Sequence, residues 1–307
     1  MGKSSLKFTA LLCASLLGAF LPSQAATKKP SRPRSPTAPA KPAPAPAPDA
    51  LLVDGQLPLK ARGAIVIDAW SGQTLYEKNS GETQYPASTT KILTALLIIE
   101  AGDLEREVEI TLEDSKVGES SLEIKPGQRI KRRQMLYGLL LKSANDVAHA
   151  LARDNAGSVE AFAEKMTARA LELGATSSHF VNPHGLHNRA HYTTPHDLAV
   201  IARAAMQQPL FRQIVSTVKY PWLDPFTLRE LTNHNRLLTR FPGCSGVKTG
   251  YTVPAQQVLV SAALRDTREV IAVVMHTDKP GIWDDSIGLL TFGLEHPPTL
   301  PTPPPLP

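Results

Sequence analysis

Cysteine is scarce in this chain of 307 residues, which contains only Cys13 and Cys244. Cys13 lies in an N-terminal apolar stretch that we expect to be removed, so one cysteine remains in the mature protein. An intramolecular disulfide is therefore excluded, and the fold must be held together by packing. We interpret Cys244 as a small, buried apolar residue. Cys244 stands four positions before Lys248, so both side chains would face the same side of a strand. The alternative to a buried apolar role is therefore a free thiol at the rim of a cleft.

A hydrophobic run long enough to cross a bilayer is also missing at the N-terminus. The apolar stretch of residues 8–21 is too short to be a good membrane span. It follows Lys3 and Lys7 and precedes Ser23-Gln24-Ala25, an order that is typical of a secretory signal peptide. We therefore predict a signal peptide over residues 1–25, cleavage after Ala25, and export to the periplasm or the cell exterior.

Large apolar side chains are nearly absent from residues 26–50, which are rich in Pro and Ala. Such a segment cannot bury enough surface to fold, and we expect a basic, disordered linker. Residues 296–307 have the same composition and predict a Pro-rich, disordered tail. One candidate globular domain remains between them, over residues 51–295.

An excess of charge is missing from the part of the chain that we expect to fold. The whole chain has a net charge of +5, of which residues 1–25 carry +2 and residues 26–50 carry +4, so residues 51–307 carry −1. The basic overall balance therefore does not indicate a nucleic-acid partner. Within the domain, the charged run of residues 129–133 is interpreted as a solvated helix start.

The order of the expected elements indicates the fold class. Residues 62–79 alternate apolar and polar side chains around Ser71-Gly72 and predict a hairpin. Further strands are expected near the C-terminal end of the domain, at 245–253, 256–266 and 269–277. Between the two groups lie the expected helices, which begin near residue 88 and include 134–141, 144–153, 159–173 and 194–206; a last helix is expected at 284–295. This order favours an α/β (α+β) fold with one antiparallel sheet, flanking helices and a helical insertion.

The stretch "PASTTKILT" at residues 86–94 contains a possible nucleophile beside a possible base. Ser88 is well suited to cap a helix, and most serines in such a position do nothing else. Lys91, however, is three residues further on and so lies on the same helical face as Ser88. The S-x-x-K pattern alone is too common to decide between the two readings.

Two further short motifs occur in the same domain. Ser143-Ala144-Asn145 stands at the junction of two expected helices, where an ordinary helix cap is the alternative reading. Lys248-Thr249-Gly250 lies on the first strand after the helical part. A cleft is expected where this edge of the sheet meets the helices.

Together these motifs resemble those of the penicillin-recognising serine enzymes, which carry S-x-x-K, S-x-N and K-T-G in this order. Within that group the chain resembles the D-alanyl-D-alanine carboxypeptidases, the low-molecular-mass penicillin-binding proteins, and the resemblance covers nearly all of residues 60–295. The similar segments are "GAIVIDAWSGQTLYEKN", "PASTTKILTALL", "SANDVAHALA", "FVNPHGLHNRAHYTTPHDLAVIARAA" and "GVKTGYT". The resemblance implies a β-lactamase/transpeptidase-like fold.

The chemistry of the motif residues agrees with that resemblance. A serine hydroxyl needs a base to become a nucleophile, and Lys91 can act as that base only when it is neutral. Burial, the positive end of the helix dipole and the nearby Lys248 all favour the neutral form. Ser88 is therefore the expected nucleophile, Lys91 its general base, and Ser143 the relay of a proton to the leaving amine.

The remaining motif residues are expected to bind substrate. Asn145 can hydrogen-bond the substrate amide, while Lys248 and Thr249 can meet a C-terminal carboxylate. Gly250 lets the backbone come close to the substrate. By resemblance, the backbone N–H of Tyr251 forms an oxyanion hole together with that of Ser88.

The implied reaction removes the terminal D-alanine from peptidoglycan stem peptides through an acyl-enzyme, and β-lactam antibiotics would acylate the same serine. A DD-endopeptidase that cleaves cross-links uses the same residues and remains an alternative, as does a penicillin-binding or wall-binding module without turnover. A β-lactamase is disfavoured because no convincing glutamate motif lies between Asn145 and Lys248. We expect no cofactor, no nucleic-acid partner and no stable membrane anchor.

Two further sets of residues leave questions open. His184, His187 and His191 are close in sequence and admit a zinc site, but the segment resembles a family loop in which histidines are not ligands, so we expect no metal. Some relatives place a basic residue after the last core strand to hold the substrate carboxylate. Lys279 is a weak candidate for that role.

Overall fold

The computed structural model describes residues 52–53, 55–223 and 228–298. The predicted signal peptide of residues 1–25 and the predicted linker of residues 26–50 lie outside the described residues. So do residues 299–307, which make up most of the predicted tail. The boundaries of these segments therefore stay predictions.

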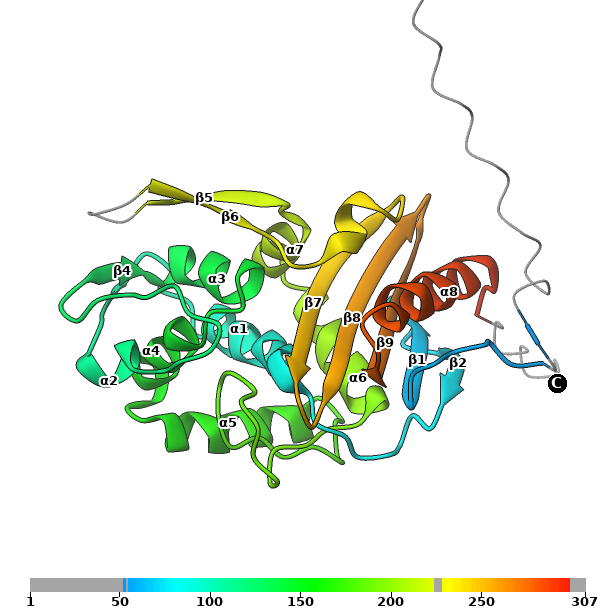
Figure 1. Ribbon diagram of the computed structural model, residues 1–307, viewed down its shortest axis with the longest axis horizontal. Coiled ribbons are helices and arrows are strands. Elements are labelled where there is room, and N and C mark those ends of the chain that lie inside the picture. Colours follow the sequence, from blue (N-terminus) through cyan, green and yellow to red (C-terminus); the bar gives the residue numbers. More distant parts are fainter. Residues whose placement is uncertain (1–51, 54, 224–227, 299–307) are drawn as a thin grey trace, which may run out of the picture. The chain divides into compact units, whose positions relative to one another are not determined.

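The centre of the domain is one five-stranded antiparallel sheet that joins both ends of the described chain (Figure 1). Its strand order is β2-β1-β9-β8-β7. The strands are β1 (Gly63–Asp68), β2 (Thr74–Lys78), β7 (Cys244–Thr252), β8 (Gln256–Arg265) and β9 (Arg268–Thr277). The N-terminal hairpin therefore pairs with β9 rather than standing alone, as the order of the elements predicts. Because β7 is the last strand in this order, its outer edge is free to form one wall of a site.

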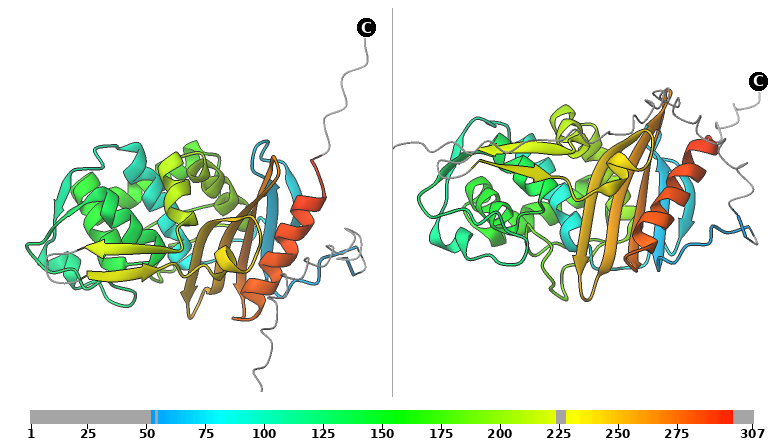
Figure 2. Two further views of the ribbon diagram at one scale, coloured as in Figure 1. Left: turned by 90° about the horizontal axis from the view of Figure 1, so that it is seen from above. Right: turned by 45° about the horizontal axis from the view of Figure 1, so that its top comes forward.

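Helices cover both faces of the sheet (Figure 2). The C-terminal helix α8 (Gly281–Glu295) packs against β1, β8 and β9 on one face. On the other face, α6 (Pro195–Met206) packs against β1 and β9, and α7 (Pro209–Ser216) packs against β7. Alternate residues of β8 and β9 enter two separate apolar clusters, one on each face, which is the pattern of a sheet buried on both sides.

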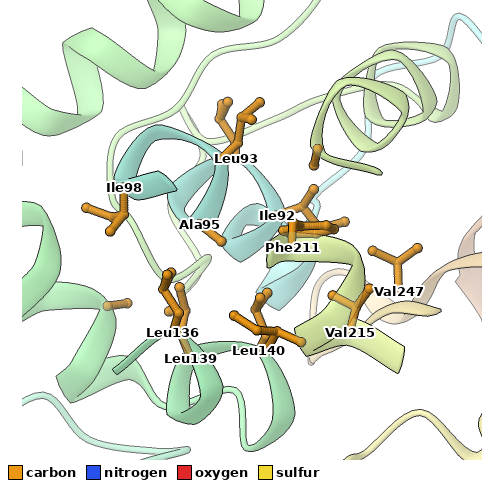
Figure 3. Close-up of a cluster of buried hydrophobic side chains, with 14 of the residues drawn as sticks. Ile92, Leu93, Ala95, Ile98, Leu136, Leu139, Leu140, Phe211, Val215 and Val247 are labelled. Carbon is orange, nitrogen blue, oxygen red and sulfur yellow. The ribbon is translucent and has the colours of Figure 1, made fainter. Parts of the chain in front are cut away.

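The helical insertion is built around α1 (Lys91–Glu100), which contacts five other helices: α3 (Arg132–Leu141), α4 (Asn145–Ala156), α5 (Val159–Glu172), α6 and α7. Its residues 91–98 are all buried, so α1 is a core helix without a solvent face. Figure 3 shows its apolar side chains meeting those of α3, α7 and β7. The labelled residues are Ile92, Leu93, Ala95, Ile98, Leu136, Leu139, Leu140, Phe211, Val215 and Val247. Each buried Leu, Ile, Val or Phe side chain contributes about 1.5–3 kcal/mol, so α1 is held firmly in place.

Several elements have no counterpart among the predicted ones. Two small antiparallel sheets pair β3 (Glu107–Glu109) with β4 (Arg129–Lys131) and β5 (Lys219–Leu223) with β6 (Leu228–Thr232). The short helix α2 (Leu112–Ser115), the helix α7 and the 3-10 turn η3 (Arg236–Thr239) were not predicted either. The predicted helix start at residues 129–133 is wrong, because residues 129–131 form β4 and α3 begins only at residue 132. Arg129 of β4 forms an ion pair with Glu109 of the neighbouring strand β3, with 2.8 Å between Nη2 and Oε2.

Cys244 does not lie where its spacing from Lys248 predicts. Cys244 pairs with Ala263 and packs against the apolar cluster on the α8 face, whereas Lys248 pairs with Val260 of the opposite cluster. The register of β7 shifts between Cys244 and Gly246, which changes the alternation of sides along the strand. The thiol is half-buried and donates a hydrogen bond to the Gly246 carbonyl oxygen.

In the part of the chain that the structure describes, no helix is both long and apolar enough to cross a membrane.

Candidate active site

Ser88 lies in a tight turn that leads into α1, and its side chain does not cap the helix. Residues 87–90 form the 3-10 turn η2, and α1 continues directly from it at Lys91. No side-chain capping hydrogen bond is present at the start of either element. Ala87 adopts a positive φ of 47°, an uncommon conformation for a residue with a side chain. The half-buried Ser88 is therefore presented on a constrained turn, with its hydroxyl left available for other partners.

The Lys91 side chain is completely buried and ends beside Ser88. Its Nζ lies 3.0 Å from Ser88 Oγ, 2.7 Å from Asn145 Oδ1 and 2.6 Å from the His184 carbonyl oxygen. The last two atoms can only accept hydrogen bonds. A neutral amine has two N–H donors and one lone pair, so donation to these two acceptors leaves the lone pair for the Ser88 hydroxyl. An ammonium could instead donate to all three oxygens, so these contacts accommodate a neutral lysine and the electrostatic surroundings decide between the two forms.

The electrostatic surroundings favour the neutral form of Lys91. Burial lowers the pKa of Lys91 well below its usual value, and the positive charge of Lys248 lowers that pKa further. The carboxylates of Asp146 and Glu119 act in the opposite direction, but they are the smaller influences. The sequence analysis predicted this lowering of the Lys91 pKa from burial and from the nearby Lys248.

Asn145 has two partners within the protein that the sequence analysis did not predict. Its Oδ1 accepts from Lys91 Nζ, and its Nδ2 donates to the Gly118 carbonyl oxygen at 3.0 Å. Its side chain therefore orients Lys91 and ties α4 to the loop that contains Gly118. Binding of a substrate amide by Asn145 stays a prediction.

Asp146, for which the sequence analysis proposed no role, holds that loop in place. The carboxylate is fully buried and accepts hydrogen bonds from Ser121 Oγ and from the backbone N–H groups of Leu122 and Ile124. Because the loop also contains Ser120, Asp146 positions one rim of the site.

Ser143 and Lys248 meet on the other side of Ser88. Lys248 Nζ lies 3.0 Å from Ser143 Oγ, and it also donates to the Thr249 carbonyl oxygen at 2.8 Å. Burial lowers the pKa of Lys248 to about 7. Ser143 has a positive φ of 62°, so it too is held in a sparsely populated conformation, as is common at functional sites. Lys248 therefore has a proton directed at Ser143 Oγ.

Gly250 brings β7 into direct contact with the turn that carries Ser88. A Cβ atom at Gly250 would lie 2.9 Å from Ser88 N, 3.1 Å from Ala87 Cβ and 3.1 Å from the Pro86 carbonyl oxygen. Any larger residue here would therefore push the strand and the nucleophile apart. The structure extends the predicted role of Gly250 from contact with a substrate to contact with the Ser88 backbone.

A pocket of about 200 Å³ opens above these residues. Its lining includes the predicted residues Ser88, Ser143, Thr249, Gly250 and Tyr251. It also includes three that were not predicted, Ser120, His234 and Gln257. Lys91 and Lys248 lie beneath the pocket, with 0% and 1% of their surface exposed.

The histidines that admitted a zinc site have other partners. His191 Nδ1 accepts from the Val181 N–H, so its Nε2–H donates to Thr90 Oγ1 at 2.8 Å, and Thr90 Oγ1 donates to the Ala87 carbonyl oxygen. Burial lowers the pKa of His191 to about 3, which keeps the ring neutral. This chain of hydrogen bonds supports the turn before Ser88.

The other two histidines belong to the same loop. The carbonyl of His184 holds Lys91, and the ring of His187 packs edge-on against Tyr85 at 4.6 Å between centroids. Among the described residues, no group of His, Cys, Asp and Glu side chains is arranged to hold a metal ion.

Comparison with known proteins identifies the family. Residues 52–279 match the family of peptidases described as D-alanyl-D-alanine carboxypeptidase. The chain belongs to this family. The match confirms the resemblance that the three motifs indicate.

Curated carboxypeptidases of the family are 35% and 37% identical to this chain over the aligned residues. It is 37% identical to the D-alanyl-D-alanine carboxypeptidase DacB2 of Mycobacterium tuberculosis over 235 residues, which are 75% of this chain and 80% of that protein. It is 35% identical to DacF of Bacillus subtilis over 232 residues, which are 73% of this chain. The matched part spans 59% of the length of DacF.

Solved structures agree in fold. A D-alanyl-D-alanine carboxypeptidase from Mycobacterium tuberculosis is 36% identical, with a TM-score of 0.75, and the match covers 80% of this chain and 96% of that one. The Streptomyces K15 DD-transpeptidase is 32% identical, with a TM-score of 0.73, and the match covers 77% and 97%. The predicted β-lactamase/transpeptidase-like fold is thereby confirmed.

In this member of the family, Lys279 does not line the pocket that contains Ser88. Lys279 instead lines a neighbouring groove, together with Arg236. Among the described residues, no basic side chain from the loop after β9 lines the catalytic pocket.

Proposed function

We propose that the protein is a serine-type carboxypeptidase that removes the terminal D-alanine from peptidoglycan stem peptides, with Ser88 as its nucleophile. The observation that carries this proposal is the 3.0 Å separation of Lys91 Nζ from Ser88 Oγ, in a completely buried site where burial and Lys248 lower the pKa of Lys91. Family membership supports the reaction class.

Acylation begins when Lys91 takes the Ser88 proton. The Ser88 oxygen then attacks the carbonyl carbon of the penultimate D-alanine. The backbone N–H groups of Ser88 and Tyr251 stabilise the negative oxygen that develops, and each such donor is worth about 3–4 kcal/mol in related chemistry. The contact of Gly250 with Ser88 N supports this role, because it brings β7 close to the turn.

Collapse of the intermediate expels the terminal D-alanine as an amine. Ser143 donates its proton to that amine and is resupplied by Lys248, with which it shares a 3.0 Å contact. The leaving carboxylate is met by the Lys248 ammonium and the Thr249 hydroxyl. Lys91 releases the proton it took from Ser88 to solvent, and Lys248 is reprotonated from solvent. Lys91 then takes a proton from the water that attacks the acyl-enzyme and returns it to the Ser88 oxygen as the ester bond breaks.

A β-lactam follows the same first step, because its strained amide presents a carbonyl to Ser88. Its leaving amine stays attached to the acyl group and blocks the approach of water, so the acyl-enzyme persists. A reaction on peptidoglycan requires export, which the predicted signal peptide of residues 1–25 supports.

Labelling with a fluorescent penicillin tests the nucleophile. The mature protein is expected to become covalently labelled, and Ser88→Ala to lose the label; a labelled Ser88→Ala protein would reject Ser88. Incubation with a pentapeptide stem, followed by mass spectrometry, tests the reaction. Release of D-alanine far above one equivalent is expected and distinguishes an enzyme from a module that acylates without turnover.

A further inference from the structure

The loop of residues 182–186 packs along the face of α1 that carries Lys91. Thr94, one turn beyond Lys91, donates from its Oγ1 to the Pro183 carbonyl oxygen at 2.6 Å. Lys91 Nζ contacts the next carbonyl oxygen of the loop, that of His184, at 2.6 Å. Because residues three apart share a helix face, two successive carbonyl groups of the loop meet two successive turns of α1.

The residue after His184 brings the loop against the turn that carries Ser88. Gly185 has a positive φ of 85°, and a Cβ atom there would overlap the Ala87 carbonyl oxygen and lie 2.8 Å from Thr90 Oγ1. Only glycine fits this approach and this backbone conformation. The loop therefore contacts η2 as well as α1, which leaves it little room to shift.

The Asn182 side chain closes the loop into a turn. Its Oδ1 accepts from the backbone N–H of Gly185 at 2.7 Å and from that of His184 at 3.3 Å. Its Nδ2 donates to the Leu186 carbonyl oxygen at 3.0 Å. Asparagine commonly stabilises turns by bonding backbone groups a few residues further on. Here one side chain joins the two halves of residues 182–186.

The ring of His184 adds a second contact inside the same turn. Its Nδ1 accepts from the backbone N–H of Leu186 at 3.2 Å. Burial lowers the pKa of His184 to about 2, so the ring stays a neutral acceptor around pH 7. The ring is thus engaged within the turn, and the carbonyl is the group of His184 that contacts Lys91.

Asn182 reaches the site only through this turn, because it does not line the pocket around Ser88. The contact that it controls is the shortest of the three made by Lys91 Nζ, at 2.6 Å to the His184 carbonyl oxygen against 2.7 Å to Asn145 Oδ1 and 3.0 Å to Ser88 Oγ. In the neutral amine, this carbonyl takes one of two N–H donors and so helps to direct the lone pair at Ser88. A displaced carbonyl would let the buried amine turn away.

We propose that Asn182 is a positioning residue for the general base. It holds the turn of residues 182–186 in the shape that keeps the His184 carbonyl on the Lys91 amine, and the amine on Ser88 Oγ. The proposal rests on the proposed function, in which Lys91 is the base, and it adds the residue that orients that base.

Two measurements on Asn182→Ala test this role. Acylation by a fluorescent penicillin is expected to slow about 10- to 100-fold, because a small displacement of a catalytic group has an effect of that order. In protein labelled with ¹³C at Cε of lysine, the NMR signal of Lys91 at pH 7 is expected to move; Lys91→Arg identifies that signal. A variant that only lowered stability would leave both readouts of the folded protein unchanged.

Asn182→Ser is the conservative variant. A serine hydroxyl accepts from the same N–H groups more weakly and does not replace the contact with Leu186. Its acylation rate is therefore expected to lie between those of Asn182→Ala and the wild type. Far-UV circular dichroism checks that each variant is folded. Should Asn182→Ala fail that check, Asn182→Ser takes its place: a Lys91 signal that moves supports the proposal, and one that stays contradicts it.

Asn188→Ala is the matched control. Asn188 follows in the same segment, and its Oδ1 accepts from the backbone N–H of Ala190 at 2.8 Å, which is also a contact within a turn. The residue is exposed, and in the described part of the chain no hydrogen bond joins its side chain to α1 or η2. This variant is expected to acylate within about 2-fold of the wild-type rate, with the Lys91 signal in place.

Three results would overturn the positioning role. They are a Lys91 signal at its wild-type position in folded Asn182→Ala, acylation of that variant at the wild-type rate, and an equal slowing of acylation in Asn188→Ala. A wild-type protein that penicillin does not acylate would instead reject the proposed function. The NMR signal would still show in that case whether Asn182 positions the amine.

Discussion

The substitution Asn145→Asp tests the protonation state of Lys91 with little change in side-chain size. It also removes the Nδ2–H that donates to the Gly118 carbonyl oxygen, as the Asn145→Ala control does. Asn145 Oδ1 lies 2.7 Å from Lys91 Nζ, and only 2% of the residue is exposed. The variant replaces a neutral acceptor with a carboxylate of nearly equal size. A negative charge at this distance favours the ammonium form, so the pKa of Lys91 must rise.

The size of the effect follows from the distance. Two unit charges 2.7 Å apart interact by about 6 kcal/mol at an effective dielectric constant of about 20. At about 1.4 kcal/mol per pH unit this corresponds to about four units. The cost of burying the new carboxylate reduces the gain, so we expect the pKa of Lys91 to rise by about two to four pH units.

The assay is the rate of acylation by a fluorescent penicillin between pH 6 and pH 10. At pH 7 the variant is expected to acylate about 100-fold or more slowly, because the neutral amine becomes rare. Expressed as a ratio to the wild-type rate at the same pH, which cancels the loss of the Lys248 ammonium above about pH 7, its rate should then climb about tenfold for each pH unit. Asn145→Ala is the control: it removes the same acceptor without adding charge, and we expect a slower rate with no such climb. An Asn145→Asp protein that acylates at the wild-type rate at pH 7 would refute the reasoning.

Three further predictions follow from individual contacts. Gly250→Ala should slow acylation about 10- to 100-fold, measured with penicillin, because its Cβ would lie 2.9 Å from Ser88 N; an unchanged rate contradicts the contact. Thr90→Val should lower the free energy of unfolding by about 1–3 kcal/mol in urea, because the buried His191 Nε2–H loses its acceptor; unaltered stability argues against this link. The pKa of Lys248 of about 7 predicts that kcat/KM for the pentapeptide falls as pH rises through about 7, when the free enzyme loses the ammonium that binds the carboxylate; a flat profile from pH 6 to 9 contradicts that role.

Local patterns in the sequence were sufficient for the main elements and for the motif residues. The alternation around Ser71-Gly72 predicted β1 and β2, and the last helix was placed three residues late, at 284 instead of Gly281. The three short motifs could be combined because each falls at the end or the edge of a regular element. Their chemistry then predicted that Ser88, Lys91, Ser143 and Lys248 share one site, which the distances agree with.

The residues that were missed depend on contacts between distant segments. Asp146 acts through backbone N–H groups that lie 22–24 positions away, and His191 acts through Thr90, 101 positions away. No local pattern reports such pairs. Similarly, β5 and β6 are short and mostly exposed, and they are anchored by the fully buried Trp222 and by stacking of Tyr220 on Tyr137 at 3.7 Å between centroids.

A direct titration of Lys91 tests the central claim, that this amine is neutral in the resting enzyme at pH 7. The protein is labelled with ¹³C at Cε of lysine, and NMR follows the signal that disappears in Lys91→Arg as the pH is changed. We expect this signal to show the neutral form at pH 7, with a pKa well below the usual 10.5. A Lys91 that remains protonated up to its usual pKa would contradict the account.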